Sequence, residues 1–149
     1  MAKSTQLAND VLDLLFPNPG TSGTFTIGGT TYTLPLRALF LSTISSAGAQ
    51  GTEWPTSGGY TSSSGGGAVG GVALNGYFTT AASAGSKSNT TAVTVTNAPA
   101  QTWADVEIHD STATTQKRLN FKGTPSLAKS VNAGDTCTVA IGGLTATET

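Results

Sequence analysis

Two runs of alternating apolar and polar residues constrain the fold of this chain more than any other feature of its sequence. The first run consists of Ala104, Asp105, Val106, Glu107, Ile108 and His109. The second consists of Arg118, Leu119, Asn120, Phe121 and Lys122. Alternation with a period of two puts apolar side chains on one face of a strand and polar ones on the other. The residues between the runs, 110–116, include no aliphatic side chain larger than alanine. The runs are therefore predicted to pair as one antiparallel hairpin.

The charged residues of this hairpin are expected on an outer face that is open to solvent. On that face Asp105 and Glu107 can lie opposite Arg118 and Lys122. Such opposite charges stabilise a strand pair by roughly 0.2–1 kcal/mol and help to fix its register.

The composition of the remaining chain favours an all-β domain. Only 10% of the 149 residues are charged, against about a quarter in ordinary globular domains. Threonine favours strands, whereas glycine and serine favour turns, and these three residue types dominate the sequence. Disorder is the alternative for such a composition. We expect it at most over residues 57–71, because elsewhere the aromatic and aliphatic residues come in phased groups.

Further strands are predicted on both sides of the central hairpin. A small hairpin over residues 24–34 turns at two glycines, which places Phe25 opposite Tyr32 and Ile27 opposite Thr30. Residues 36–41 are apolar on both faces except at Arg37, as in a central strand. Other strands are expected at 72–78, 91–96, 126–131 and 137–141, with turns at 84–89 and 132–135. This pattern predicts an antiparallel β-sandwich or jelly roll over residues 24–149. Its core layer is expected to include Val106, Ile108, Leu119, Phe121, Cys137, Val139 and Ile141.

Residues 1–23 are predicted to form a short helix and a connector. Ser4 or Thr5 can cap the helix, and Pro17 ends it. Its apolar stripe consists of Leu7, Val11, Leu14 and Leu15. A helix this short needs a surface to pack on. That surface is either the chain's own β-domain or a neighbouring subunit, and the sequence leaves both open. If it is a neighbour, these four residues are the expected partner contacts of the helix.

A long loop rich in glycine and serine is expected over residues 42–71. Long loops in compact domains are often functional, so we expect residues 50–71 to form a surface excursion that a partner orders. Trp54 and Tyr60 are its candidate contact residues, because Trp and Tyr are enriched at binding hot spots.

The sequence gives no sign of catalysis, of a cofactor or of a metal site. His109, Asp110 and Ser111 are adjacent, but neighbouring strand residues point to opposite faces and cannot converge as a triad. One cysteine and one histidine are too few for a zinc site. The single cysteine also excludes an internal disulfide. Nucleic acid is not expected, because the net charge is −1 and no basic cluster is present. No apolar run is long enough for a membrane span or a signal peptide, so we expect synthesis in a cytoplasm.

Three segments resemble small virion proteins of tailed bacteriophages, a family described as tail-fibre-like that includes capsid cement, or decoration, proteins. Residues 4–15 (STQLANDVLDLL) are similar to the family's short N-terminal LxNxxLD helix. Residues 51–53 (GTE) and 57–60 (SGGY) are similar to its GTEVSGGGYAR segment. The third segment runs from residue 85 through Trp103 and residues 108–110 (IHD) to residues 131–136 (VNAGDT) and 144–145 (LT). It is similar to the family's C-terminal region, and the whole resemblance covers most of the chain. The hairpin at 24–34 departs from the family pattern as an insertion.

The resemblance implies a non-enzymatic structural protein of the virion. The first hypothesis is a cement protein on the outer capsid surface that binds the major capsid protein and copies of itself, as a trimer or a dimer. The alternative is a tail or tail-fibre component that attaches to host-surface glycans through Trp54, Tyr60 and Tyr77. A glycan-processing enzyme is the third hypothesis.

Overall fold

The computed structural model describes residues 4–16, 22–46, 49–63, 69–112, 116, 118–122 and 128–148, with the backbone alone at 120–122. The predicted helix is present as α1 (Thr5–Leu15). The side-chain oxygen of Ser4 accepts a hydrogen bond from the Leu7 amide at 3.2 Å, which satisfies one of the free N–H groups at the helix start. Pro17 lies outside the described residues.

The rest of the described chain is built from short strands that pair only antiparallel. The structure thus confirms an all-β fold with a short N-terminal helix. The strands are β1 (Gly23–Ile27), β2 (Thr30–Leu34), β3 (Arg37–Leu41), β4 (Val72–Ala73), β5 (Ser86–Ser88), β6 (Val93–Val95), β7 (Gln101–Trp103), β8 (Asp105–His109), β9 (Arg118–Lys122), β10 (Lys129–Val131), β11 (Cys137–Val139) and β12 (Thr145–Thr147).

The largest sheet has the strand order β4-β3-β8-β9. As predicted, residues 36–41 supply a central strand, β3, and the runs at 104–109 and 118–122 pair as β8 and β9. Ala38 pairs with Ile108 and Phe40 with Val106, and these four side chains form one face of the sheet in the core. The opposite face is also buried on β8, because loops from residues 42–71 contact it.

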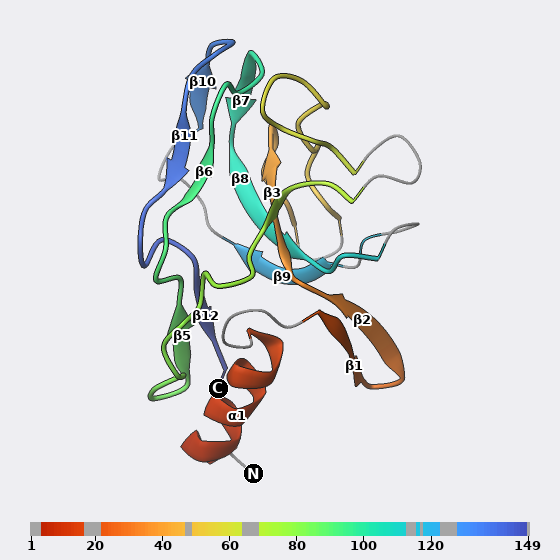
Figure 1. Cartoon of the computed structure of the whole chain (residues 1–149), viewed down its shortest axis with the longest axis vertical. Helices are drawn as coiled ribbons and strands as arrows, with labels where there is room; N and C mark the ends of the chain where they lie inside the picture. The colour runs from red at the N-terminus through yellow and green to blue at the C-terminus, as the bar shows by residue number, and fades with distance from the viewer. Residues whose placement is uncertain are drawn as a thin grey trace.

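Among the described residues, four two-stranded sheets accompany the largest one: β1-β2, β5-β12, β6-β11 and β7-β10. The β1-β2 register is the predicted one, with Phe25 opposite Tyr32 and Ile27 opposite Thr30. Figure 1 shows α1, β1, β2, β5 and β12 at one end of the molecule, with β7, β10 and β11 at the other.

Several expected elements differ in the structure. The turn expected at 84–89 is restricted to Ala84 and Gly85, and Ser86–Ser88 form β5. The strand expected at 72–78 ends at Ala73, because a turn follows with Gly76 at φ +77°. The polar C-terminal tail contributes β12, which pairs with β5.

The expected core layer is confirmed at Val106, Ile108, Cys137 and Val139, which are buried. Leu119 is half-buried against this core. The expected burial of Ile141 is wrong, since its side chain is 68% exposed. The reason is that β11 ends at Val139 and a turn follows in which the Gly143 amide donates to the Ala140 carbonyl. The Phe121 side chain lies outside the described part of the structure.

Candidate functional site

The helix α1 docks on its own β-domain through its polar residues and its inner apolar side. Asn9 accepts a hydrogen bond from the Gly85 amide at 2.9 Å, and Asp13 accepts one from the Ala82 amide at 2.9 Å. The Lys87 ammonium lies 2.6 Å from Asp13 and donates to the Phe16 carbonyl at 2.6 Å. Of the two surfaces that the sequence left open, the structure shows the intramolecular one.

The outer edge of α1 leaves two leucines uncovered. Leu7 is 50% and Leu14 is 52% exposed, and their i, i+7 spacing places them on one line along the helix. Val11 is half-buried beside them, whereas Leu15 is buried with Ala8 and Leu12. Of the four helix residues expected to contact a partner, Leu7 and Leu14 therefore have the most surface to offer. We call these two the outer leucine pair.

Trp54 and Tyr60, the other expected contact residues, lie in the core. None of the Trp54 surface and 2% of the Tyr60 surface is exposed. The Trp54 ring packs on Phe40 with ring centroids 5.2 Å apart, and its N–H donates to the Thr102 carbonyl at 2.8 Å. The Tyr60 hydroxyl donates to Glu53 at 2.9 Å and accepts from the Phe40 amide at 3.1 Å. A side chain without exposed surface cannot touch a partner in this conformation. The expected surface position of Trp54 is therefore wrong.

The reason is that the segment around Trp54 extends the sheet. The Ser42 amide donates to the Thr52 carbonyl at 2.7 Å, and the Trp54 amide donates to the Phe40 carbonyl at 2.9 Å. Further along, the Gly71 amide donates to the Thr61 carbonyl at 2.8 Å. The expectation that only a partner orders residues 50–71 is thus wrong for the described part of this segment, because backbone hydrogen bonds tie it to the chain's own sheet. Residues 64–68 lie outside that part.

The expected solvent face of β8 is buried. Asp105, Glu107 and His109 are at most 2% exposed. Glu107 contacts His109 Nε2 at 3.0 Å and Arg118 at 3.1 Å. Of the predicted cross-strand ion pairs, the structure therefore shows that of Glu107 with Arg118, and this pair is covered. Burial raises the pKa of Glu107, but hydrogen bonds from His109 and Ser45 and the charge of Arg118 lower it more. The net pKa is below the ordinary value.

The adjacent His109, Asp110 and Ser111 have separate partners. His109 lies against Glu107, while Asp110 accepts from the Thr33 amide at 3.0 Å. The Ser111 hydroxyl donates to the Pro35 carbonyl. These contacts anchor β8 and the residues after it to β2 and do not assemble a nucleophile, a base and an acid.

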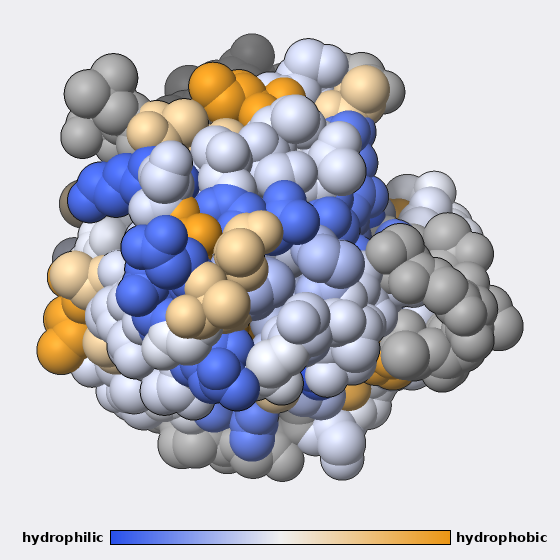
Figure 2. All heavy atoms as spheres, turned by 90° about the horizontal axis from the view of Figure 1, so that it is seen from above, coloured by the Kyte–Doolittle hydropathy of each residue, from blue (hydrophilic) through white to orange (hydrophobic). Residues whose placement is uncertain are grey.

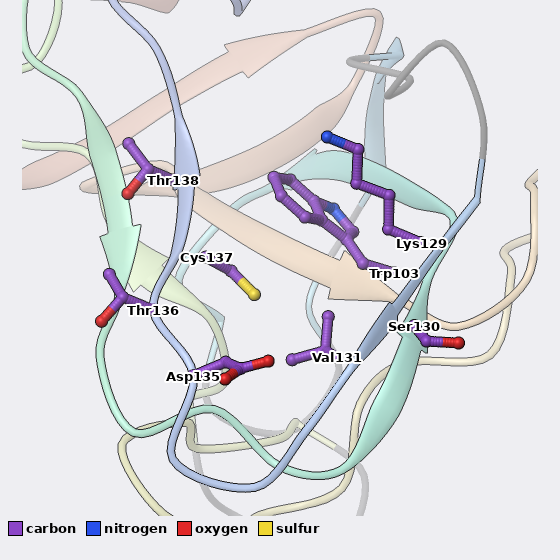
Figure 3. A pocket seen from close by; sticks show the side chains of 8 residues that line it. All are labelled: Trp103, Lys129, Ser130, Val131, Asp135, Thr136, Cys137 and Thr138. Carbon is purple, nitrogen blue, oxygen red and sulfur yellow. The ribbon is translucent and has the colours of Figure 1, made fainter.

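A pocket that the sequence did not indicate lies at the opposite end from α1, between β10 and β11. Its volume is about 430 Å³, within the range of roughly 300–1,000 Å³ typical of ligand sites. Trp103, Val131, Asp135 and Cys137 point into it, and Lys129 runs beside the indole ring (Figure 3). Burial, and then the charge of Asp135, raises the pKa of the Cys137 thiol. No periodic pattern could have revealed the pocket, because its wall comes from separate strands.

The surface of the described residues offers few other features. On the face shown in Figure 2, apolar residues form only small, separate patches. Within the described ranges, no three His, Cys, Asp or Glu side chains are grouped to hold a metal ion. Among the described residues, no helix is long and apolar enough to cross a membrane.

Comparison of the chain with protein-family models, with curated proteins and with solved structures found no match.

Proposed function

We propose that this chain is a non-enzymatic structural protein of a tailed-phage virion. In this proposal it is a decoration protein that binds the outer surface of the major capsid protein shell and stabilises it. The observation that carries the proposal is the outer leucine pair. Leu7 and Leu14 stay half exposed on a helix whose opposite side is fixed to the domain. The same helix carries the first of the three segments that resemble the phage family.

The energetics suit a protein that binds in many copies. Fully burying a leucine contributes about 1.5–3 kcal/mol, so covering the exposed half of each contributes roughly 1 kcal/mol. Two leucines then supply about 2 kcal/mol per copy, close to a 30-fold change in affinity. Symmetry and avidity multiply such weak contacts over a shell. A chain with a net charge of −1 also places little electrostatic repulsion between neighbouring copies.

The alternative role in a tail fibre has less support. It relied on aromatic side chains for stacking on glycans, and Trp54 and Tyr60 are buried. Tyr77 is half-buried. A catalytic role has no support from the contacts of His109, Asp110 and Ser111.

The test is binding to coat-protein shells assembled without this chain. The double variant Leu7→Glu, Leu14→Lys removes the apolar pair. It places a negative charge near the start of the helix and a positive charge near its end, where the helix dipole favours them. The glutamate also completes a capping box with Ser4. We expect at least 20-fold weaker binding in a sedimentation assay with an unchanged unfolding midpoint. Ile141→Lys is the matched control, because Ile141 is an exposed isoleucine outside the helix, in the turn after β11. It should bind as the wild type does. Wild-type occupancy by the double variant would contradict the proposed contact, and a wild-type chain that never binds shells would contradict the proposed function.

A further inference from the structure

The two strands that border the pocket each pair on one side only with the strands that the structure describes. In the described part of the chain, β10 pairs with β7 and β11 pairs with β6, but β10 and β11 do not pair with each other. They diverge from a turn that is held by hydrogen bonds between Asn132 and Asp135. The space between them is the pocket of about 430 Å³ (Figure 3).

Backbone groups form much of the pocket wall. Ser130, Thr136 and Thr138 line the pocket, yet their side chains point away from it (Figure 3). They must therefore line it with main-chain atoms. A strand that pairs on one side only presents unpaired N–H and C=O groups on the other.

Trp103, which borders the pocket, has an unsatisfied donor that is buried beneath the surface. Trp103 is 9% exposed, and its buried indole N–H has no hydrogen-bond partner within the described structure. Buried polar groups in native proteins are nearly always paired. The indole lies beside Val131 and Cys137 on the apolar floor (Figure 3). A ligand on this floor would lie against the edge of the Trp103 ring without reaching its buried N–H.

We propose that an extended segment of another polypeptide binds here as an added strand between β10 and β11. A strand carries alternating N–H and C=O groups that can pair with both free edges, and its every second side chain can enter the floor. The floor suits a small or β-branched apolar residue. Lys129 forms no ion pair with a described residue, so it favours an acidic residue at that end of the segment. A glycan fits less well, because so little of the Trp103 ring is exposed for stacking.

This site is independent of the outer leucine pair, so its test does not depend on shell binding. The probe is a synthetic capped heptapeptide of alternating Thr and Val residues with one terminal Glu. Its matched control is the same peptide N-methylated on alternate residues, which keeps the side chains and removes backbone donors. The readout is the ¹H–¹⁵N NMR spectrum, in which the two tryptophans give two indole signals.

We expect millimolar peptide to shift the Trp103 indole signal but not that of Trp54. Amide exchange in β10 and β11 should slow at least 10-fold. The N-methylated peptide should do neither. Lys129→Glu, an exposed substitution, should weaken binding of the Glu peptide several-fold and strengthen binding of a Lys counterpart. The proposal is overturned if the peptide leaves the Trp103 signal unchanged, if N-methylation has no effect, or if a panel of oligosaccharides shifts that signal and the peptide does not.

Discussion

A buried lysine joins the N-terminal helix to the β-domain. The Lys87 side chain is 2% exposed, whereas its partner Asp13 is 41% exposed. The ammonium also donates to the Phe16 carbonyl at the helix C-terminus, where a positive charge is favourable. Removing one partner of a buried pair leaves an uncompensated charge. We therefore expect this contact to decide how firmly α1 is held.

The first prediction concerns the Asp13→Asn variant and pH. The hydrogen bond from Lys87 holds the pKa of Asp13 below its ordinary value, so the carboxylate stabilises the fold above the unfolded pKa, about 3.8. This stability is lost as the pH falls below 4 through the folded pKa. Allowing for the exposure of Asp13, Asp13→Asn should cost about 1–3 kcal/mol at pH 7. Urea unfolding should show the difference from wild type shrinking below pH 4. A difference that is constant with pH would contradict the ion pair.

The second prediction concerns Trp54, whose role changes from a surface contact to a core residue. Trp54→Ala should lower the free energy of unfolding by about 3–5 kcal/mol, because it removes the packing on Phe40 and the hydrogen bond to Thr102. Chemical denaturation measures this cost. A loss below 1 kcal/mol would mean that the indole is not packed as the structure has it.

At the scale of elements, the glycines of the segment 57–60 permit a close approach to the chain around Asn97. The Gly59 amide donates to the Asn97 carbonyl at 2.8 Å, and a Cβ atom at Gly58 would collide with that same carbonyl. The absence of a side chain at these glycines therefore lets the segment pack against the β-domain, whereas the sequence suggested that the segment could be disordered.

The third prediction compares two glycines with the same backbone conformation. Gly58 has φ +58° and Gly28 has φ +56°, but a Cβ at Gly28 meets nothing within 4 Å. Gly28→Ala should cost about 1–2 kcal/mol for the left-handed conformation alone. Gly58→Ala should cost about 1–3 kcal/mol more because of the clash. Equal costs in thermal or urea unfolding would show that the segment can move away from Asn97.

The spacing of apolar residues and the residues typical of caps and turns were sufficient to predict those elements that neighbouring residues determine. The helix cap follows from the side-chain oxygen of Ser4, the β1-β2 register from a two-glycine turn, and the pairing of β8 with β9 from side-chain alternation. Residues 86–88 and 145–147 gave no such signal, because each is a short polar stretch that becomes a strand only by pairing with the other. For the candidate site, the sequence predicts the four residues of the apolar helix stripe but not which of them are exposed. Which of its leucines stay exposed depends on docking against β5.

At the scale of the whole molecule, a loop covers the sheet face that the sequence assigned to solvent. Alternation shows which residues share a face, but not what lies over that face. Asp105 is fully buried, and one of its oxygens accepts from the Ser45 amide at 3.2 Å. Arg37 on the same face donates to the Gly71 carbonyl at 2.6 Å. Such long-range hydrogen bonds make a buried polar face stable, and no local pattern encodes them. The pocket between β10 and β11 escaped prediction for the same reason.

The proposed binding of this chain to copies of itself and to a shell depends on residues that the fold leaves exposed. The trimer or dimer stays a prediction. The outer leucine pair is the most exposed apolar surface that α1 offers for such a contact.

The most direct test of the decoration role is the number of copies of this chain per particle. Under the proposed virion role, this number is measured by quantitative mass spectrometry of purified virions of the tailed phage that the proposal takes as the source of the chain, with the major capsid protein as the internal standard. A decoration protein should be present at a fixed ratio of the same order as the coat subunits, and it should remain with tail-less capsids. A few copies per particle that fractionate with isolated tails would contradict the account and favour the tail-fibre alternative.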